Sequence, residues 1–192
     1  LDAERVKRFI LSTQKKKAEN TACFASEMSE RKFFTELNKQ LATRGITDVL
    51  RKGFRYISEI FDMYYPLPSE LNPTAQEMYA KNIFCVTRQL FYSKDNSNSI
   101  DVMVSLNGMP VMTIELKNHY TGQTVENAIK QYQTDRDAND PLLAPKRCAV
   151  HFAVDDDDIR MCTWLSGKNS WFLPFNKGVN GGAGNPVNPH GV

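Results

Sequence analysis

The sequence predicts an α/β or α+β domain in which a mixed β-sheet is flanked by helices. Apolar residues recur at helical spacing in the first 45 residues, runs of β-branched and aromatic residues begin at residue 83, and a further helical segment separates those runs. With 192 residues, 41% of them hydrophobic, the chain is long enough to bury a core. We expect one domain over residues 1–175 and a linker or surface strap over 176–192, which is rich in Gly, Asn and Pro.

Three segments are predicted to be helices. The first covers residues 4–17, and the second follows Ser29 and ends before Gly45, a common helix stop. The third covers residues 124–136, where Thr124 can cap the first turn. The apolar faces of the first two helices contain Val6, Phe9, Ile10, Phe33, Phe34, Leu37 and Leu41.

Strands are predicted where β-branched and aromatic residues alternate with polar ones. The predicted strands are residues 83–92, 100–106, 110–117, 147–154, 159–165 and 171–175. A polar turn over 94–99 and an acidic turn over Asp155–Asp158 separate neighbouring strands. Residues 53–65 are aromatic but ambiguous, and Pro66, Pro68 and Pro73 predict an irregular connection after them.

The composition excludes several classes of protein. The net charge of +2 neither requires nor forbids nucleic acid as a partner. The four cysteines are far apart and form no CxxC pair, so they predict buried, reduced thiols of a cytoplasmic protein rather than a zinc site. No run approaches the roughly 18 apolar residues of a membrane span, so we expect no membrane partner. The chain has no phosphate-binding Gly-Lys loop and should not bind ATP by itself.

Asn107 and Gly108 give the strongest hairpin signal in the sequence. If the apolar residues of both strands, including Ile114 and Leu116 of the second, are buried on one face, the register is fixed, because a one-residue slip reverses every side chain. A two-residue loop would split that face, so we expect a loop of three or five residues. This register puts Asp101 directly opposite Glu115, with Lys117 two residues further on the same face.

Two carboxylates opposed in this way suggest a cation site. Directly opposed Cβ atoms lie about 4.5–5.5 Å apart, so the carboxylates repel each other unless a cation lies between them. Hard oxygen ligands with room for water suit Mg²⁺ or Mn²⁺. Such an ion can activate water, and Lys117 can orient or deprotonate that water. Asp101, Glu115 and Lys117 therefore predict phosphodiester hydrolysis.

Simpler interpretations compete with each of these assignments. Glu-x-Lys on a half-exposed strand is typical of a solvated face, and the matching acid across the hairpin is what favours catalysis. The run Asp155–Asp158 is more typical of a solvated turn than of a second cation site. His119, at a strand end, is more typical of a surface residue than of a general base. Glu30 or Glu36 could supply an upstream acid to the site.

Long segments of the chain resemble a known family. The string SIDVMVSLNGMPVMTIELKN resembles the D…ExK core of the PD-(D/E)xK nuclease superfamily. Together with TRQLFYS, NHYTGQTVENAIKQY and FNKGVNGGAGNPVNPHG, it resembles the N-terminal region of the R (restriction) subunit of type I restriction–modification enzymes. The resemblance runs from about residue 24 to 191. It implies a restriction-endonuclease-like fold that cuts double-stranded DNA with Mg²⁺, and an ATP-dependent translocase after the tail.

The resemblance also implies roles for individual residues. Asp101 and Glu115 match the metal-binding acids, joined by the backbone carbonyl of Leu116, and Lys117 matches the catalytic lysine. Gln131 matches the glutamine of a Gln-x-x-x-Tyr element near the site. The sequence departs from that element because Asp135 stands where the tyrosine is expected. Lys130, Tyr132 and Arg136 flank Gln131 and are predicted contacts to the DNA backbone.

The leading hypothesis is an endonuclease domain that works with the methyltransferase (M) and specificity (S) subunits of a type I complex. ATP would be used only by the motor region. One alternative is a non-catalytic module that docks the R subunit onto the methyltransferase core. Another is a stand-alone repair nuclease of the same superfamily.

Overall fold

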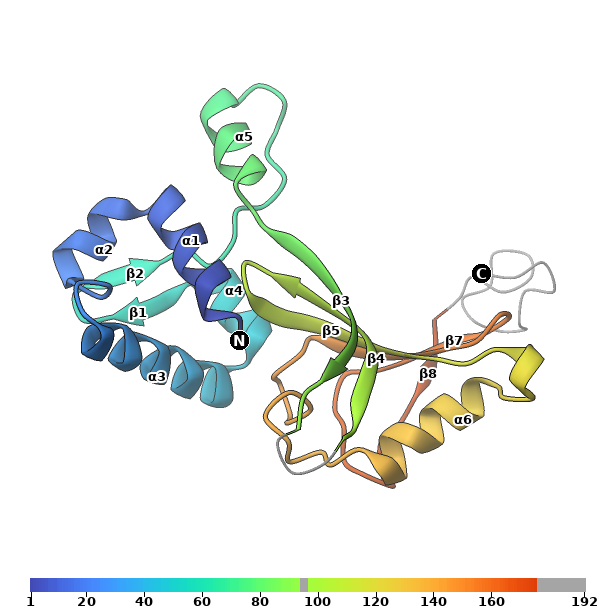
Figure 1. Cartoon of the computed structure of the whole chain (residues 1–192). Helices are drawn as coiled ribbons and strands as arrows, with labels where there is room; N and C mark the ends of the chain where they lie inside the picture. The colour runs from blue at the N-terminus through green and yellow to red at the C-terminus, as the bar shows by residue number, and fades with distance from the viewer. Residues whose placement is uncertain (94–96, 176–192) are drawn as a thin grey trace. The chain divides into compact units, whose positions relative to one another are not determined.

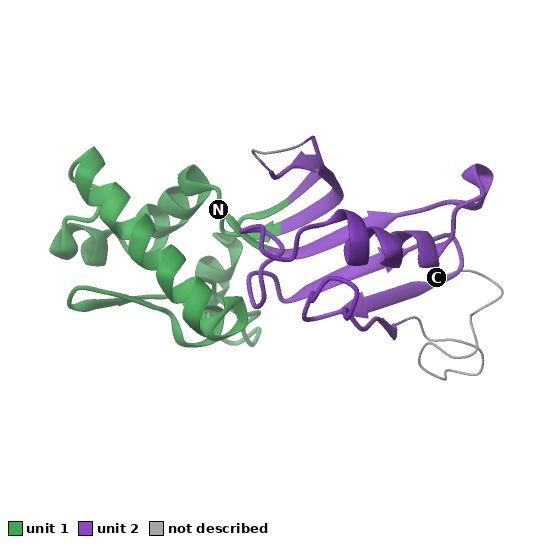
Figure 2. Ribbon diagram, turned by 90° about the horizontal axis from the view of Figure 1, so that it is seen from below, with its two compact units in different colours: residues 1–85, 105–110 green, residues 86–104, 111–192 purple. Residues whose placement is uncertain are grey.

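The computed structural model describes residues 1–93 and 97–175 and confirms an α+β fold (Figure 1). The chain divides into two compact units (Figure 2). Unit 1 comprises residues 1–85 and 105–110, and unit 2 comprises 86–104 and 111–192. The domain expected over 1–175 thus contains two compact units, and the linker predicted over 176–192 lies outside the described residues.

The predicted helices and strands of the described residues occur in the predicted order, and the structure adds two helices, a two-stranded hairpin and a 3₁₀ turn. The helices are α1 (Ala3–Thr13), α2 (Lys15–Thr21), α3 (Glu27–Arg44), α4 (Ile46–Lys52), α5 (Pro73–Ala80) and α6 (Val125–Lys130). Two single turns are the 3₁₀-helix His119–Thr121 and the π-helix Gln131–Asp135. The strands are β1 (Phe54–Tyr56), β2 (Glu59–Phe61), β3 (Phe84–Phe91), β4 (Ser99–Leu106), β5 (Met109–Leu116), β6 (Val150–Val154), β7 (Ile159–Cys162) and β8 (Leu173–Pro174).

The first predicted helix is two helices, because Gln14 leaves the helical conformation between α1 and α2. The backbone of Gln14 has φ −140° and ψ 39°. Its side-chain amide bonds the backbone of Asp62 twice, accepting from the N–H at 2.8 Å and donating to the carbonyl at 2.8 Å. A contact between residues so far apart in sequence overrides the local helical pattern of 4–17.

The core of unit 1 forms around Phe33 on α3. Ser26 caps this helix by accepting from the N–H of Ser29, and Gly45 ends it as predicted. The ring of Phe33 lies edge-to-face against Phe54 and Phe61, with centroids 5.0 and 5.5 Å apart. These two rings come from β1 and β2, so the ambiguous stretch 53–65 contains a short antiparallel hairpin.

Helix α5 lies where an irregular connection was predicted. Asn72 caps it by accepting from the N–H of Ala75 at 3.0 Å. Pro73 occupies the first helical turn, where its missing N–H costs nothing because that N–H has no partner within the helix. The proline therefore begins a helix here rather than ending one.

Unit 2 contains most of a six-stranded sheet with strand order β3-β4-β5-β6-β7-β8. Strand β5 runs parallel to β6, while β6–β7 and β7–β8 are antiparallel, which makes the sheet mixed as predicted. Helix α6 packs through Val125 and Ala128 against Ala153 of β6. Thr124 precedes the helix, and its N–H donates to the side chain of Asn127 at 2.9 Å.

The loop between β4 and β5 contains only Asn107 and Gly108, so the predicted loop of three or five residues is wrong. Both residues have positive φ, 51° and 81°, as a two-residue type I′ turn requires. Asn107 is fully buried. Its side chain tolerates burial because it donates to the carbonyl of Met63 and accepts from the N–H of Ile83. Contacts within unit 1 therefore determine the turn. Because the longer loop is wrong, the direct opposition of Asp101 and Glu115 that was predicted from it is wrong as well.

Candidate active site

The deeply buried face of β5 is polar, contrary to the prediction that Ile114 and Leu116 would lie on it. Thr113 and Glu115 are both fully buried, whereas Leu116 is 46% exposed. The hydroxyl of Thr113 lies 2.9 Å from the hydroxyl of Tyr132 and 2.6 Å from Nδ1 of His151. These hydrogen bonds satisfy the polar groups around Thr113, and they allow the polar face of the strand to be the buried one.

Glu115 is a fully buried acid with an incomplete set of partners. Its Oε1 accepts from Nε of Arg136 at 2.8 Å, and its buried Oε2 has no hydrogen-bond partner among the described residues. Burial, together with the nearby Asp101 carboxylate, raises the pKa of Glu115 to about 7 against the opposing effect of Arg136. A buried carboxylate oxygen without a partner lowers the stability of the fold unless a cation or a proton binds to it.

Asp101 comes close to Glu115 even though the predicted register is wrong. It is half-buried on β4, and its Oδ2 accepts from the backbone N–H of Leu116 at 2.8 Å. Leu116 directly follows Glu115, so this bond brings the Asp101 carboxylate to the end of β5 where Glu115 lies. The structure therefore brings together the two acids that the sequence singles out.

Lys117 lies immediately beyond β5. Its backbone N–H donates to the carbonyl of Val154 at 2.8 Å, which continues the pairing of β5 with β6 by one residue. Its side chain is half-buried and lies two residues after Glu115. The catalytic role of Lys117, and the role of the Leu116 carbonyl as a ligand, stay predictions.

Gln131 is the first residue of the π-helix that extends α6. Its Oε1 is buried and, like Oε2 of Glu115, has no hydrogen-bond partner among the described residues. The N–H of Arg136 donates to the carbonyl of Gln131 at 3.1 Å, an i to i+5 bond that closes the π turn. This turn ends the helix, because the backbone of Arg136 is extended, with φ −106° and ψ 126°.

Two of the three predicted DNA contacts are contradicted by burial. Tyr132 has no exposed surface and binds Thr113, so it is a core residue and cannot reach DNA in this conformation. Arg136 is 8% exposed, and its guanidinium is occupied by Glu115 and the carbonyl of Ser99. Lys130 is exposed at the end of α6, and its contact with DNA stays a prediction.

The donor set at this site fits a hard divalent cation. Asp101 and Glu115 supply carboxylate oxygens, and Oε2 of Glu115 is buried without a hydrogen-bond partner in the described part of the chain. Mg²⁺ usually takes one or two carboxylates and completes its octahedron with water, phosphate or backbone oxygens. Within residues 1–93 and 97–175, no three His, Cys, Asp or Glu side chains cluster as metal ligands.

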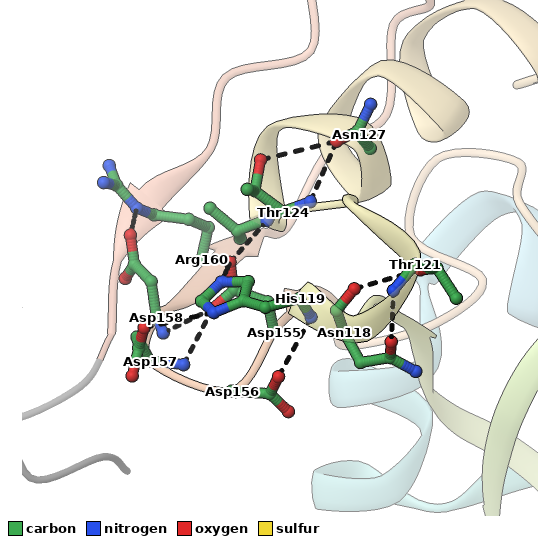
Figure 3. Close-up of polar contacts among 11 residues, drawn as sticks. Asn118, His119, Thr121, Thr124, Asn127, Asp155, Asp156, Asp157, Asp158 and Arg160 are labelled. Atoms are coloured by element: carbon green, nitrogen blue, oxygen red, sulfur yellow. Dashed lines mark hydrogen bonds and ion pairs between the residues drawn. The ribbon is translucent and has the colours of Figure 1, made fainter.

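The acidic run Asp155–Asp158 is a hydrogen-bonded turn between β6 and β7 (Figure 3). Asp155 accepts from the N–H groups of Asp157 and Asp158 with Oδ1, and from Val125 with Oδ2. His119 lies 3.5 Å from a carboxylate oxygen of Asp155 and 3.5 Å from one of Asp157. These contacts join the loop after β5 to the turn and support a structural role for both.

The two upstream acids have partners within unit 1. Glu30 accepts from Nζ of Lys7 at 2.6 Å, and Glu36 accepts from the side chain of Gln40 at 2.9 Å. Neither residue therefore gains support as a ligand from its contacts.

Arg136 is the residue whose place in the site was not foreseen. The sequence gives one usable signal, because an acid buried on a strand requires a cationic partner. Nothing in the local pattern, however, identifies which basic residue supplies it.

A family model described as the type I restriction enzyme R protein N terminus matches residues 6–170. The match covers most of the chain and includes Asp101, Glu115, Lys117 and Gln131. No curated protein matches the chain. Among the described residues, no helix is both long and apolar enough to cross a membrane.

Proposed function

The chain belongs to the family of type I restriction enzyme R protein N termini, and from this premise we propose that it is a Mg²⁺-dependent endonuclease domain acting on double-stranded DNA. The observation that carries the proposal is Glu115, a fully buried carboxylate beside Asp101, one oxygen of which has no hydrogen-bond partner within residues 1–93 and 97–175. A buried group in this state loses its hydration without full compensation. A bound cation supplies that compensation and gives the arrangement a chemical use.

Each residue has a distinct part in the proposed hydrolysis. Asp101, Glu115 and the Leu116 carbonyl would hold Mg²⁺, for which Mn²⁺ can substitute. When bound, the ion supplies a water of lowered pKa and neutralises charge on the phosphate. Lys117 orients that water and helps to hold the scissile phosphate.

The neighbouring turn supplies further groups. The amide of Gln131 can orient water or phosphate, because its buried Oε1 has no hydrogen-bond partner among the residues described. Lys130 is exposed one residue before it and can contact the DNA backbone. Phosphate contacts position DNA without reading its sequence. Cleavage by this domain would then have no sequence specificity of its own.

The family supports a place in a larger assembly. We infer partnership with the M and S subunits and with a motor region that uses ATP, in the cytoplasm. In this assembly the specificity subunit recognises DNA, the motor moves it, and this domain cuts both strands. The 192-residue chain need not cut DNA by itself.

A non-catalytic docking module is the main alternative. A docking module gains nothing from a buried carboxylate with a free oxygen, since such a group lowers the free energy of unfolding. The partly satisfied Glu115 therefore favours the nuclease over the docking module. A stand-alone repair nuclease of the same superfamily would have the same site but no motor or partner subunits.

The test is cleavage of supercoiled plasmid by the complete R subunit with its M and S partners, ATP and Mg²⁺ or Mn²⁺. Asp101→Ala and Lys117→Ala should abolish cleavage and leave ATP hydrolysis intact. Asp156→Ala, on the acidic turn, is a matched acidic control that should cut normally. Cleavage at the wild-type rate by either site variant would reject the site and favour the docking module.

A further inference from the structure

Arg136 connects the two strands that carry Asp101 and Glu115. Its Nε donates to Oε1 of Glu115 at 2.8 Å, and its Nη2 donates to the carbonyl of Ser99 at 2.7 Å. Ser99 stands two residues before Asp101 on β4. Because a guanidinium holds its donors in one rigid plane, two such bonds fix both the position and the direction of the group.

The pair formed by Arg136 and Glu115 is almost completely removed from solvent. The side chain of Arg136 is 6% exposed, and that of Glu115 is 0% exposed. Water and salt therefore screen the pair little. Arg136 occupies Oε1, so Oε2 is the oxygen that remains for any further partner.

The π turn determines the position of the Arg136 backbone. Its backbone N–H is bonded to the carbonyl of Gln131, so both residues belong to the same turn of backbone. Glu115, which Arg136 contacts, has a buried oxygen without a partner in the described part of the chain. Gln131, at the other end of the turn, has one as well. One irregular turn thus fixes Gln131 directly and Glu115 through Arg136.

We propose that Arg136 is a positioning residue that holds Glu115 so that Oε2 alone faces the divalent cation. The inference rests on the proposed function, because it assigns a role in binding the cation of that site. Arg136 itself touches neither the cation nor DNA. Glu115 would then bind the ion through one oxygen, and the arginine would keep the carboxylate from turning away or binding through both.

The experiment measures Mn²⁺ binding to the 192-residue chain by calorimetry, with Arg136→Lys and Arg136→Gln beside wild type. Outer partners of metal ligands commonly change affinity by about 10- to 100-fold. We expect Arg136→Gln to weaken binding within that range and Arg136→Lys to weaken it at the lower end, because lysine keeps the charge but not the planar pair of donors.

Arg160 provides a matched control in the same unit. Its Nε donates to Asp158 at 2.6 Å, and this pair does not involve Glu115. Arg160→Gln also removes an arginine from an ion pair, and Mn²⁺ affinity should stay within about twofold of wild type.

A second measurement separates positioning from general damage. In the complete complex, Arg136→Lys should raise the Mn²⁺ concentration that gives half-maximal cleavage and recover the wild-type rate at saturating Mn²⁺. A merely structural defect would instead lower the rate at every Mn²⁺ concentration, and that result would overturn the inference. Folding of each variant is checked by thermal denaturation, and Arg136→Lys decides the question if Arg136→Gln does not fold.

The possible failures are distinguishable. If wild type binds no Mn²⁺, or if Asp101→Asn and Glu115→Gln bind it normally, the proposed function fails and the inference fails with it. If those two variants lose binding while Arg136→Lys binds as tightly as wild type, the site is correct and the positioning role of Arg136 is wrong.

Discussion

Glu115 and Asp155 are two buried carboxylates of the same unit that the protein treats in opposite ways. Asp155 accepts backbone N–H groups at 2.7–2.8 Å on both oxygens. Burial acts to raise the pKa of Asp155, but these hydrogen bonds and His119 lower it below its usual value. Glu115 has an arginine on one oxygen only, and burial raises its pKa to about 7.

The comparison separates a structural acid from one that is prepared for a ligand. Backbone N–H groups are fixed donors, and a carboxylate that they saturate belongs to the framework of a turn. An open oxygen is not enough by itself, since Oδ1 of buried Asp158 also has no hydrogen-bond partner among the described residues. Glu115 differs because its open oxygen belongs to an acid beside Asp101 whose pKa is raised to about 7. The partners of each oxygen and the neighbouring charges are therefore more informative together than a count of acidic residues.

The largest expected effect is that of Glu115→Gln on cleavage. The amide keeps the size of the side chain but removes the charge that would hold the cation. We expect cleavage by the complete complex to fall about 10²- to 10³-fold, the loss seen when one preorganised electrostatic group is removed. Plasmid cleavage at saturating Mg²⁺ measures it, and Asp155→Asn is the matched control.

Both variants change a buried acid to its amide, so the comparison holds the chemistry of the substitution constant. If Asp155→Asn impairs cleavage as strongly as Glu115→Gln, the division between structural and ligand-binding acids is wrong.

The next effect is on stability. Arg136→Met leaves the Glu115 charge buried without a partner and should lower the free energy of unfolding by about 3–5 kcal/mol. The double variant Glu115→Met/Arg136→Met removes both charges and should recover most of that loss. Urea denaturation followed by circular dichroism measures all three proteins.

Arg160→Met supplies the comparison for this prediction. The Arg160 side chain is 27% exposed, so its pair with Asp158 should contribute only about 1 kcal/mol or less. If Arg136→Met and Arg160→Met lower the free energy of unfolding equally, the different burial of the two ion pairs does not determine their contributions to stability.

A third expectation concerns acid stability near Glu115. Burial lowers the pKa of His151 to about 4, so the folded protein holds this imidazole neutral. Its contribution is complete above the unfolded pKa of about 6.5 and is lost as the pH falls toward 4, which amounts to roughly 3 kcal/mol. The variant His151→Gln should not show this loss of stability in acid.

Glu115 titrates in the opposite sense, because its raised pKa makes the folded state gain stability as the pH falls below about 7. The difference between wild type and His151→Gln isolates the histidine, since both proteins keep Glu115. Parallel pH profiles of unfolding free energy for the two proteins would contradict the prediction.

The smallest expected effect is that of Asp155→Asn on stability. The amide oxygen can still accept part of the turn's hydrogen bonds, so we expect a loss of about 1–2 kcal/mol near neutral pH. Because the folded pKa is lowered, wild type holds this contribution above the unfolded pKa of about 4 and loses it as the pH falls through the folded pKa. Denaturation should therefore show a smaller difference in unfolding free energy between wild type and Asp155→Asn at pH 3 than at pH 7.

The sequence predicted the mixed sheet, and it singled out the two acids that the structure brings together, because strand alternation and the Asn-Gly turn are local signals. It failed at the register because we assumed that Ile114 and Leu116 face the core. The structure instead buries Glu115 beside polar partners from distant segments. Buried Asn107 is likewise explained by contacts with Met63 and Ile83, which no local pattern contains.

Arg136 illustrates the same limit within the site. As a basic residue near Gln131 it was a reasonable DNA contact, and only its burial against Glu115 shows otherwise. Gln14 and α5 were missed for related reasons, since a distant backbone partner ends one helix and a capping residue begins the other.

The π turn between Gln131 and Arg136 has a consequence for how such a site can change during evolution. The bond from the Arg136 N–H to the Gln131 carbonyl spans five residues where an α-helix spans four, so this last turn holds one residue more than regular winding does. Deletion of one residue from 133–135 would shorten the turn and change the direction in which the arginine leaves it toward Glu115. Divergent relatives can therefore keep the acids, the lysine and the glutamine and still lose this geometry through a change in length alone.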